Sequence, residues 1–106
     1  MAALMPIKVV MRDALTGIES EPLLDPTNAL HRVLPEAADS EFPLLGRIDW
    51  YANVDFTSDE VSGLLDEVDL LLRRITDPDL PYVKELRDFI QSCRTKPRCR
   101  LTFYGD

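Results

Sequence analysis

Apolar residues recur every three or four positions along the second half of the chain, the spacing that places them on one face of an α-helix. Thr57 or Ser58 is suited to cap the first such helix, and Asp59 and Glu60 follow beside its positive end. Its apolar face is predicted to comprise Val61, Leu64, Leu65, Val68, Leu71, Leu72 and Ile75.

A second helix is predicted from about Leu80 to Thr95, with Asp79 as a candidate cap. The turn at residues 77–79 separates it from the first helix, and so short a connection predicts an antiparallel pair. The apolar face of the second helix is predicted to comprise Tyr82, Val83, Leu86, Phe89, Ile90 and Cys93.

Alternation of apolar and polar residues predicts a strand near each end of the chain, at residues 7–12 and 98–104. Gly17 tolerates a positive φ, so it predicts a turn that leads into a further strand over about residues 18–24. We expect the C-terminal strand to lie beside the N-terminal one, because both would otherwise leave open edges.

The segment between these strands and the long helices holds one short helix. Asp25 or Thr27 is the candidate cap, and Pro35 ends the helix after about two turns. Residues 36–43 are mostly acidic and small, which is typical of a surface loop.

Residues 42–51 are apolar but interrupted by Pro43 and Gly46, so a short strand or an extended segment crossing the core is predicted there. The order of elements predicts a single domain over residues 1–106 with an α+β fold. We expect a two-layer domain in which an antiparallel helical hairpin covers one face of a small, mainly antiparallel sheet.

Charge is unevenly distributed along the 106 residues, which carry 12 Lys and Arg against 19 Asp and Glu, a net charge of −7. Residues 1–60 hold four basic and eleven acidic side chains, whereas residues 94–100 hold four basic ones and no acid. The acidic balance disfavours binding of nucleic acid or anionic membrane over most of the surface. We therefore expect neither as a partner, and no apolar run approaches the ~20 residues of a membrane span.

Cys93 and Cys99 are too few for a disulfide framework. Residues 1–10 lack the features of a signal peptide, so the sequence predicts a cytoplasmic location, where a structural disulfide is uncommon. Two cysteines and His31 offer too few ligands for a metal, and the four glycines form no phosphate loop. We expect no metal and no cofactor.

Leu70 stands out because helical spacing places it opposite the centre of the apolar stripe, on the face expected to be solvated. Gly63 and several charged residues share that face. A lone exposed leucine is common, but an apolar side chain ringed by charges also suits docking of a partner or a second copy of the chain.

Residues 49–56 form an aromatic and polar segment that we expect to be irregular. Asp49, Trp50, Tyr51, Asn53 and Asp55 form a composition typical of a recognition surface, where aromatic residues anchor and short polar groups adapt. The alternative is that the aromatic residues fill the core. We expect Phe56 to be buried, and both alternatives stay open for Trp50 and Tyr51.

His31 is the only histidine, so any imidazole-based acid–base chemistry depends on it. No nucleophile motif accompanies it, and a surface histidine of a short helix is the simpler interpretation. A small enzyme or small-molecule binder would use a pocket between sheet and helices near His31, with Asp49 or Asp55 as its carboxylate.

Two short motifs, FPLLGRIDWY at residues 42–51 and LTFYGD at residues 101–106, flank the predicted helical hairpin. They resemble uncharacterised bacterial proteins with an FPLL-x-x-ID-x-Y motif and a C-terminal aromatic-x-Gly-Asp ending. Some small acidic proteins of this kind resemble immunity proteins that neutralise a toxin. The resemblance covers the last 65 residues or so and implies no catalytic residue.

The leading expectation is therefore a non-enzymatic cytoplasmic protein that binds another protein, as a toxin-neutralising immunity protein would. A basic protein is a candidate partner, because it would suit the acidic surface. The candidate binding residues are Asp49, Trp50, Tyr51, Asn53, Asp55 and Leu70. The alternatives are the small-molecule binder or enzyme near His31, and a homodimer formed through the Leu70 face as part of a larger assembly.

Overall fold

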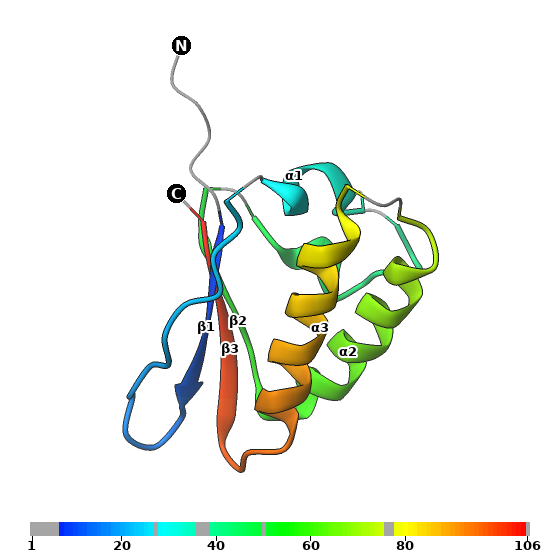
Figure 1. Ribbon diagram of the computed structural model, residues 1–106. Coiled ribbons are helices and arrows are strands. Elements are labelled where there is room, and N and C mark those ends of the chain that lie inside the picture. The colour runs from blue at the N-terminus through cyan, green and yellow to red at the C-terminus, as the bar shows by residue number, and fades with distance from the viewer. Residues whose placement is uncertain (1–6, 27, 36–38, 50, 76–77, 106) are drawn as a thin grey trace.

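The structure, a computed structural model, describes residues 7–26, 28–35, 39–49, 51–75 and 78–105. A three-stranded sheet forms one layer and two long helices form the other, as Figure 1 shows. The predicted α+β two-layer arrangement is confirmed.

The sheet consists of β1 (Lys8–Asp13), β2 (Asn53–Phe56) and β3 (Cys99–Tyr104) in the order β1-β3-β2, with both pairings antiparallel. The C-terminal strand is therefore the central one, and it lies beside the N-terminal strand as predicted. The strand β2 was not predicted, because the segment that contains it was expected to be irregular.

One face of the sheet packs against the helices. Val9, Phe56, Leu101 and Phe103 are fully buried there, and the rings of Phe56 and Phe103 meet edge to face with centroids 5.5 Å apart. Because side chains alternate along a strand, the residues between these lie on the other face. No helix of the described ranges covers that other face (Figure 1).

The helical layer consists of α2 (Ser58–Leu72) and α3 (Leu80–Arg94), which run antiparallel (Figure 1). Thr57 and Glu60 form a reciprocal capping box at the start of α2, which confirms Thr57 as its cap. Asp79 precedes α3, but its side chain makes no capping hydrogen bond. It pairs instead with Arg32 at 2.7 Å.

The short helix α1 (Ala29–Val33) begins where Asp25 supplies acceptors for its free N–H groups. The buried carboxylate of Asp25 accepts hydrogen bonds from the backbone N–H of Ala29 at 2.8 Å and of Leu30 at 2.9 Å. Asp25 thus performs the predicted capping role from outside the helix, and Thr27 lies outside the described residues.

The strand predicted at residues 18–24 is not a regular strand. Gly17 forms the expected turn at φ 75°, but only isolated bridges join Glu19 and Leu23 to β1. The Ser20 hydroxyl accepts a hydrogen bond from the backbone N–H of Met11 at 3.0 Å. In a regular ladder that N–H would donate to a backbone carbonyl. The two bridges also differ in register by one residue, so they do not continue a single regular ladder.

The described residues of the segment at 42–51, which are 42–49 and Tyr51, contain neither the predicted short strand nor a fully extended stretch. A single 3₁₀ turn, η1 (Leu45–Arg47), occupies their centre, while Phe42, Leu45 and Ile48 are buried in the core. The segment fills the core as expected, but in a helical conformation, because a buried carboxylate of α2 accepts the free N–H groups at the start of the turn.

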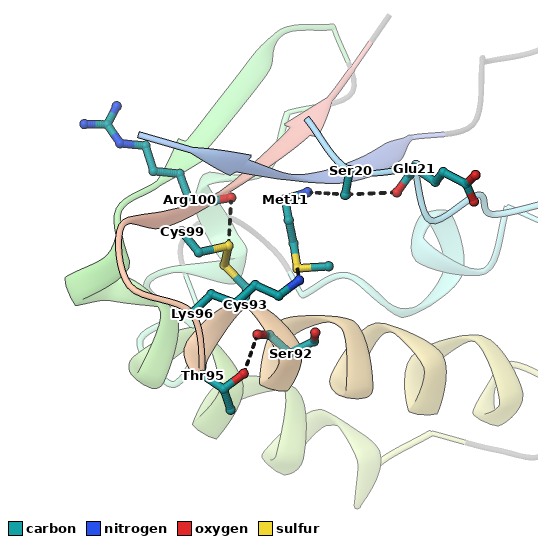
Figure 2. Close-up of a disulfide and its surroundings, with 9 residues drawn as sticks. All are labelled: Met11, Ser20, Glu21, Ser92, Cys93, Thr95, Lys96, Cys99 and Arg100. Atoms are coloured by element: carbon teal, nitrogen blue, oxygen red, sulfur yellow. Dashed lines mark hydrogen bonds between the residues drawn. A yellow bond between two sulfur atoms is a disulfide. The ribbon is translucent and has the colours of Figure 1, made fainter. Parts of the chain in front are cut away.

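Cys93 and Cys99 form a disulfide, which the sequence analysis did not expect (Figure 2). The pairing links the last turn of α3 to the first residue of β3, with a Cα–Cα distance of 5.6 Å. Helical and strand periodicity direct both side chains into the core, and this tertiary packing brings them together.

Candidate functional site

The candidate site is built on the turn that connects η1 to β2. Asp49 accepts a hydrogen bond from the backbone N–H of Tyr51 at 2.8 Å, so a short side chain fixes the turn locally. Tyr51 is 68% exposed. Of the two alternatives for Tyr51, exposure is correct, and Trp50 lies outside the described residues.

Gly105 holds the same turn from the other side. Its N–H donates to the carbonyl of Ala52 at 3.1 Å. A Cβ at position 105 would lie 2.5 Å from the carbonyl oxygens of Asp49 and of Ala52, which is too close for any side chain. The turn therefore packs directly on the backbone after β3, and only glycine permits this approach.

Asn53 and Asp55 lie on β2, separated by one residue and therefore on the same face, and both are exposed. Asp55 is opposite Thr102 of β3, and the buried Thr102 hydroxyl donates to the Asp55 carboxylate at 2.5 Å. The prediction that these residues belong to an irregular loop is wrong, since pairing with β3 makes them part of the sheet.

Arg47 shields the outer edge of β2. Its guanidinium donates to the backbone carbonyl of Asp55 at 3.2 Å, lies 4.8 Å from the ring centroid of Phe56 and pairs with Glu60. An edge strand exposes unpaired groups that invite another strand, and a charged side chain over this edge opposes such pairing. A partner would therefore meet the side chains of β2 rather than extend the sheet.

Tyr104 ends β3 beside Asn53, on the uncovered face of the sheet. Its hydroxyl donates a hydrogen bond to Glu19, and this bond raises the pKa of the phenol. The ammonium of Lys8 lies 5.2 Å from the centre of the ring. Tyr104 is thus held across β1 and borders the candidate site with a second, half-buried aromatic ring.

The prediction that Leu70 is solvated is wrong. It is half-buried and packs against the core, because residues 42–48 cover the face of α2 on which it lies. On that same face, a Cβ at Gly63 would lie 3.0 Å from Leu44, and the buried Glu67 carboxylate accepts hydrogen bonds from the N–H groups of Leu44 and Leu45.

The structure therefore brings together only part of the predicted site. Asp49, Tyr51, Asn53 and Asp55 follow one another along one turn and one strand. Leu70 belongs to α2 and to a face that the chain itself covers. The name "Tyr51 surface" is used below for Asp49, Tyr51, Asn53 and Asp55.

His31 is exposed on α1 and is not part of the described lining of the cavity of about 360 Å³ that opens nearby, so the predicted pocket at His31 stays a prediction. The described lining includes Arg32, Phe42, Leu71 and Arg74, so the cavity lies between α1, α2 and the segment before η1 rather than between sheet and helices. Asp49 and Asp55 are likewise not part of its described lining.

Two features of the site escaped the sequence analysis. Arg47 and Gly105 act on the Tyr51 surface through tertiary contacts. Both lie within the two short motifs described above, but those motifs do not indicate which residues they contact. The short alternation of Val54 and Phe56 with polar residues was the available signal for β2, but it spans only four residues and includes Asn and Asp, which are uncommon in strands.

Within the ranges that the structure describes, no three His, Cys, Asp or Glu side chains group as a metal site. No helix in those same ranges is long and apolar enough to cross a membrane. Comparisons of the chain with protein-family models, with curated proteins and with solved structures found no match.

Proposed function

We propose that this chain is a non-enzymatic protein that binds another protein through the Tyr51 surface. The observation that carries the proposal is the 68% exposure of Tyr51 on a backbone fixed by the Asp49 side chain and by Gly105. An exposed aromatic side chain on a fixed turn loses little conformational freedom on binding, and tyrosines are enriched among residues that dominate interfaces.

The charges around Tyr51 favour a basic partner. Asp49 and Asp55 are exposed carboxylates on either side of it. Complementary charges at the margin of an interface accelerate association and exclude partners of like charge. The Thr102 hydroxyl orients the Asp55 carboxylate, so its charge is presented in a fixed position.

A more specific form of the proposal is that the partner is a toxin which this chain neutralises. It is supported by the net charge of −7 and by the resemblance of its FPLL-x-x-ID-x-Y and Gly-Asp motifs to those of small bacterial proteins.

A photo-crosslinking amino acid at position 51 tests the binding proposal in cells of the source organism. We expect one protein to be crosslinked from position 51 and not from exposed Lys84 of α3, the matched control. Tyr51→Ala should abolish co-purification of that protein, while Leu24→Ala, which truncates another exposed residue, should leave it unchanged. An identical crosslinking pattern from both positions would refute the proposal.

The proposal that the partner is a toxin is tested by measuring cell growth. The captured protein is expressed alone and together with this chain. Growth arrest that is relieved by the unaltered chain, and not by Tyr51→Ala, supports neutralisation. A captured protein that does not arrest growth contradicts the toxin form and leaves protein binding standing.

The cavity beside α1 supports a small-molecule binder as a second candidate function. Apolar Phe42 and Leu71 line it together with Arg32 and Arg74, a combination suited to an anionic ligand with an apolar part. Arg32 is paired with Asp79 and Arg74 with Glu41, so a ligand would compete with these ion pairs. A thermal-shift screen of metabolites tests this candidate, and Leu71→Trp, which fills the cavity, should abolish any hit.

The remaining expectations are tested separately. Light scattering over a concentration series tests the homodimer through Leu70, since a strict monomer excludes it. For the cytoplasmic location, the Cys93–Cys99 disulfide is the relevant feature, because lasting disulfides are typical of oxidising compartments. Free thiols in protein trapped directly from its source cells would favour the cytoplasm.

A further inference from the structure

Arg12 of β1 and Arg100 of β3 are directly opposite each other in the antiparallel register. Both are exposed, and neither pairs with a carboxylate of the described residues. Figure 2 shows the Arg100 side chain pointing away from the helices, and alternation along β1 places Arg12 on that same face, where both side chains are exposed although Val10 and Thr102 on it are buried. Like charges opposite each other destabilise a sheet, so this pair is suited to hold an anion between its guanidinium groups.

A cavity of about 310 Å³ adjoins the arginine pair, lined by Arg12, Arg100 and the turn at residues 13–17. Asp13 is the only acidic residue of this described lining. Its carboxylate already accepts hydrogen bonds from the N–H groups of Leu15 at 2.8 Å and Thr16 at 3.0 Å, and Arg98 lies 3.6 Å away. The Asp13 carboxylate is therefore largely engaged, whereas neither guanidinium group forms an ion pair within the described residues. Glu19 is opposite Arg12 in an isolated bridge on the other side of β1, but its carboxylate accepts the hydrogen bond of the Tyr104 hydroxyl.

This end of the molecule is basic although the chain is acidic. The turns at residues 12–18 and 94–100 are joined by a hydrogen bond from the N–H of Ala14 to the carbonyl of Arg98 at 2.8 Å. Together they carry five basic residues and one acidic residue, while the rest of the chain carries seven basic and 18 acidic ones. Residues 12–18 and 94–100 are called the basic end below.

Two large apolar side chains project from the basic end. Leu15 is 73% exposed and Ile18 is 71% exposed, more than the other exposed large hydrophobic residues of the described chain. They flank the tight turn at Gly17, where the segment after β1 protrudes beyond the sheet at the end opposite the chain termini (Figure 1). Apolar side chains at a protruding turn can enter the acyl-chain boundary of a membrane, while the cations around them contact its anionic headgroups.

We propose that the basic end docks on an anionic phospholipid surface, with a lipid phosphate held between Arg12 and Arg100. Lys96 and Arg98 contact neighbouring headgroups, and Leu15 and Ile18 enter the interfacial layer of the bilayer. A soluble phosphate would satisfy the arginine pair but would leave both apolar side chains in water. An anionic bilayer satisfies both features at once.

The net charge of −7 does not oppose this docking. Charges separated by more than ~8 Å are largely screened at physiological ionic strength. Acidic residues at the opposite end of the molecule are therefore screened from a membrane at the basic end. Asp79, for example, precedes α3, whose 15 residues separate it from Arg94 by more than one screening length. The expectation of no membrane partner was drawn from the charge of the whole chain, and its uneven distribution changes that balance.

Most of the Tyr51 surface lies away from the basic end, and only Asp55, opposite Thr102, comes near Arg100. Arg100 lies near the start of β3, whereas the Tyr51 surface adjoins Tyr104 and Gly105 at the end of that strand. Membrane docking and protein binding can therefore occur together, and either proposal can fail without the other.

Sedimentation with lipid vesicles tests the docking. We expect the protein to bind vesicles of equal parts phosphatidylcholine and phosphatidylglycerol, to release them as salt is raised, and not to bind phosphatidylcholine alone. Arg12→Gln/Arg100→Gln should weaken binding about thirty-fold, since each cation near the surface contributes roughly a factor of five. Leu15→Ser/Ile18→Ser should weaken it about tenfold.

Matched controls change the same properties elsewhere. Arg73→Gln/Lys84→Gln removes two exposed cations from the helices, and Leu24→Ser removes an exposed leucine outside the basic end. Both controls should bind as the unaltered protein does. Absence of binding to the anionic vesicles, or equal losses in test and control variants, would overturn the proposal.

Two further measurements separate other anions from the membrane. Binding to poly-glutamate without binding to vesicles would assign the basic end to an acidic protein and overturn the lipid proposal. Thermal protection by inorganic phosphate without vesicle binding would also overturn it. Without lipid, Arg12→Gln/Arg100→Gln should unfold at no lower temperature than the unaltered protein, because the substitution removes a repulsion, so a loss of docking is not a loss of fold.

Discussion

The buried Glu67 carboxylate in α2 accepts a hydrogen bond from the backbone N–H of Leu45, 22 residues earlier, at 2.9 Å. A second N–H, that of Leu44, lies 3.1 Å from the same carboxylate. Glu67 of α2 therefore caps the 3₁₀ turn η1, because it accepts hydrogen bonds from the first N–H groups of that turn through a tertiary contact. This contact attaches the segment that contains Phe42 and Leu45 to the helical layer.

Replacement of Glu67 by Ala should destabilise the protein by about 2–3 kcal/mol, because the buried N–H of Leu45 and the partly buried N–H of Leu44 lose their acceptor. Chemical denaturation measures the change. Asp66→Ala removes the exposed neighbouring carboxylate and should change the free energy of unfolding by less than about 0.5 kcal/mol. Similar losses in both variants would contradict the capping role.

Leu70 and Leu72 should respond alike to truncation. Both are half-buried and pack against the core, so each substitution by Ala should cost about 1–2 kcal/mol, less than the ~2–5 kcal/mol expected for the buried Leu65. Denaturant unfolding of the three variants checks the order. A negligible cost at Leu70 alone would indicate that residues 42–48 do not cover it.

The disulfide should stabilise the connection between α3 and β3. Closing so short a loop lowers the conformational entropy of the unfolded chain, and Cys93→Ser/Cys99→Ser should cost about 2 kcal/mol. The loop also contains Arg98 at φ 59°, a conformation that residues other than glycine seldom adopt. Thermal unfolding with and without a reducing agent measures the effect, and the double variant, which has no disulfide to reduce, is the control.

Glu60 should make stability depend on pH. The N–H of Thr57, with Arg47 beside it, lowers the pKa of the Glu60 carboxyl below its ordinary value of 4.5. A lowered pKa in the folded state gives stability that is present above the unfolded-state pKa and is lost as pH falls through the folded-state pKa. Glu60→Gln should therefore be less stable than the unaltered protein at neutral pH.

The difference in the free energy of unfolding between Glu60→Gln and the unaltered protein should shrink below pH 4.5. It should vanish once the Glu60 carboxyl is protonated in both the folded and the unfolded state. Parallel urea titrations at several pH values measure it. Asp66→Asn, an exposed substitution in the middle of α2, provides the comparison. A difference between Glu60→Gln and the unaltered protein that does not change with pH would refute the assignment.

Local rules were sufficient wherever one element determines its own conformation. The apolar stripes of α2 and α3, the capping pair Thr57 and Glu60, and the turn at Gly17 depend on spacing and backbone chemistry within a few residues. Asp49, Tyr51, Asn53 and Asp55 are near one another because they lie on one continuous segment, and their binding role stays a prediction. The close packing of their turn against the backbone after β3 depends on Gly105, which is distant in sequence.

Contacts between distant residues decided the rest. Leu70 looked exposed because helical periodicity locates the face of a residue relative to its own helix but not what other segments cover that face. The strand β2 exists because β3 pairs with it, and the disulfide exists because α3 and β3 bring Cys93 beside Cys99.

The sequence by itself thus determined the long helices, the two terminal strands and an acidic chain with a basic stretch near its end. Only the tertiary structure placed Arg12 opposite Arg100, set Leu15 and Ile18 beside them, and located this basic end away from Tyr51. The physical reason is that periodicity acts over a few residues, whereas strand register and the packing of loops on helices join residues that are far apart in the chain.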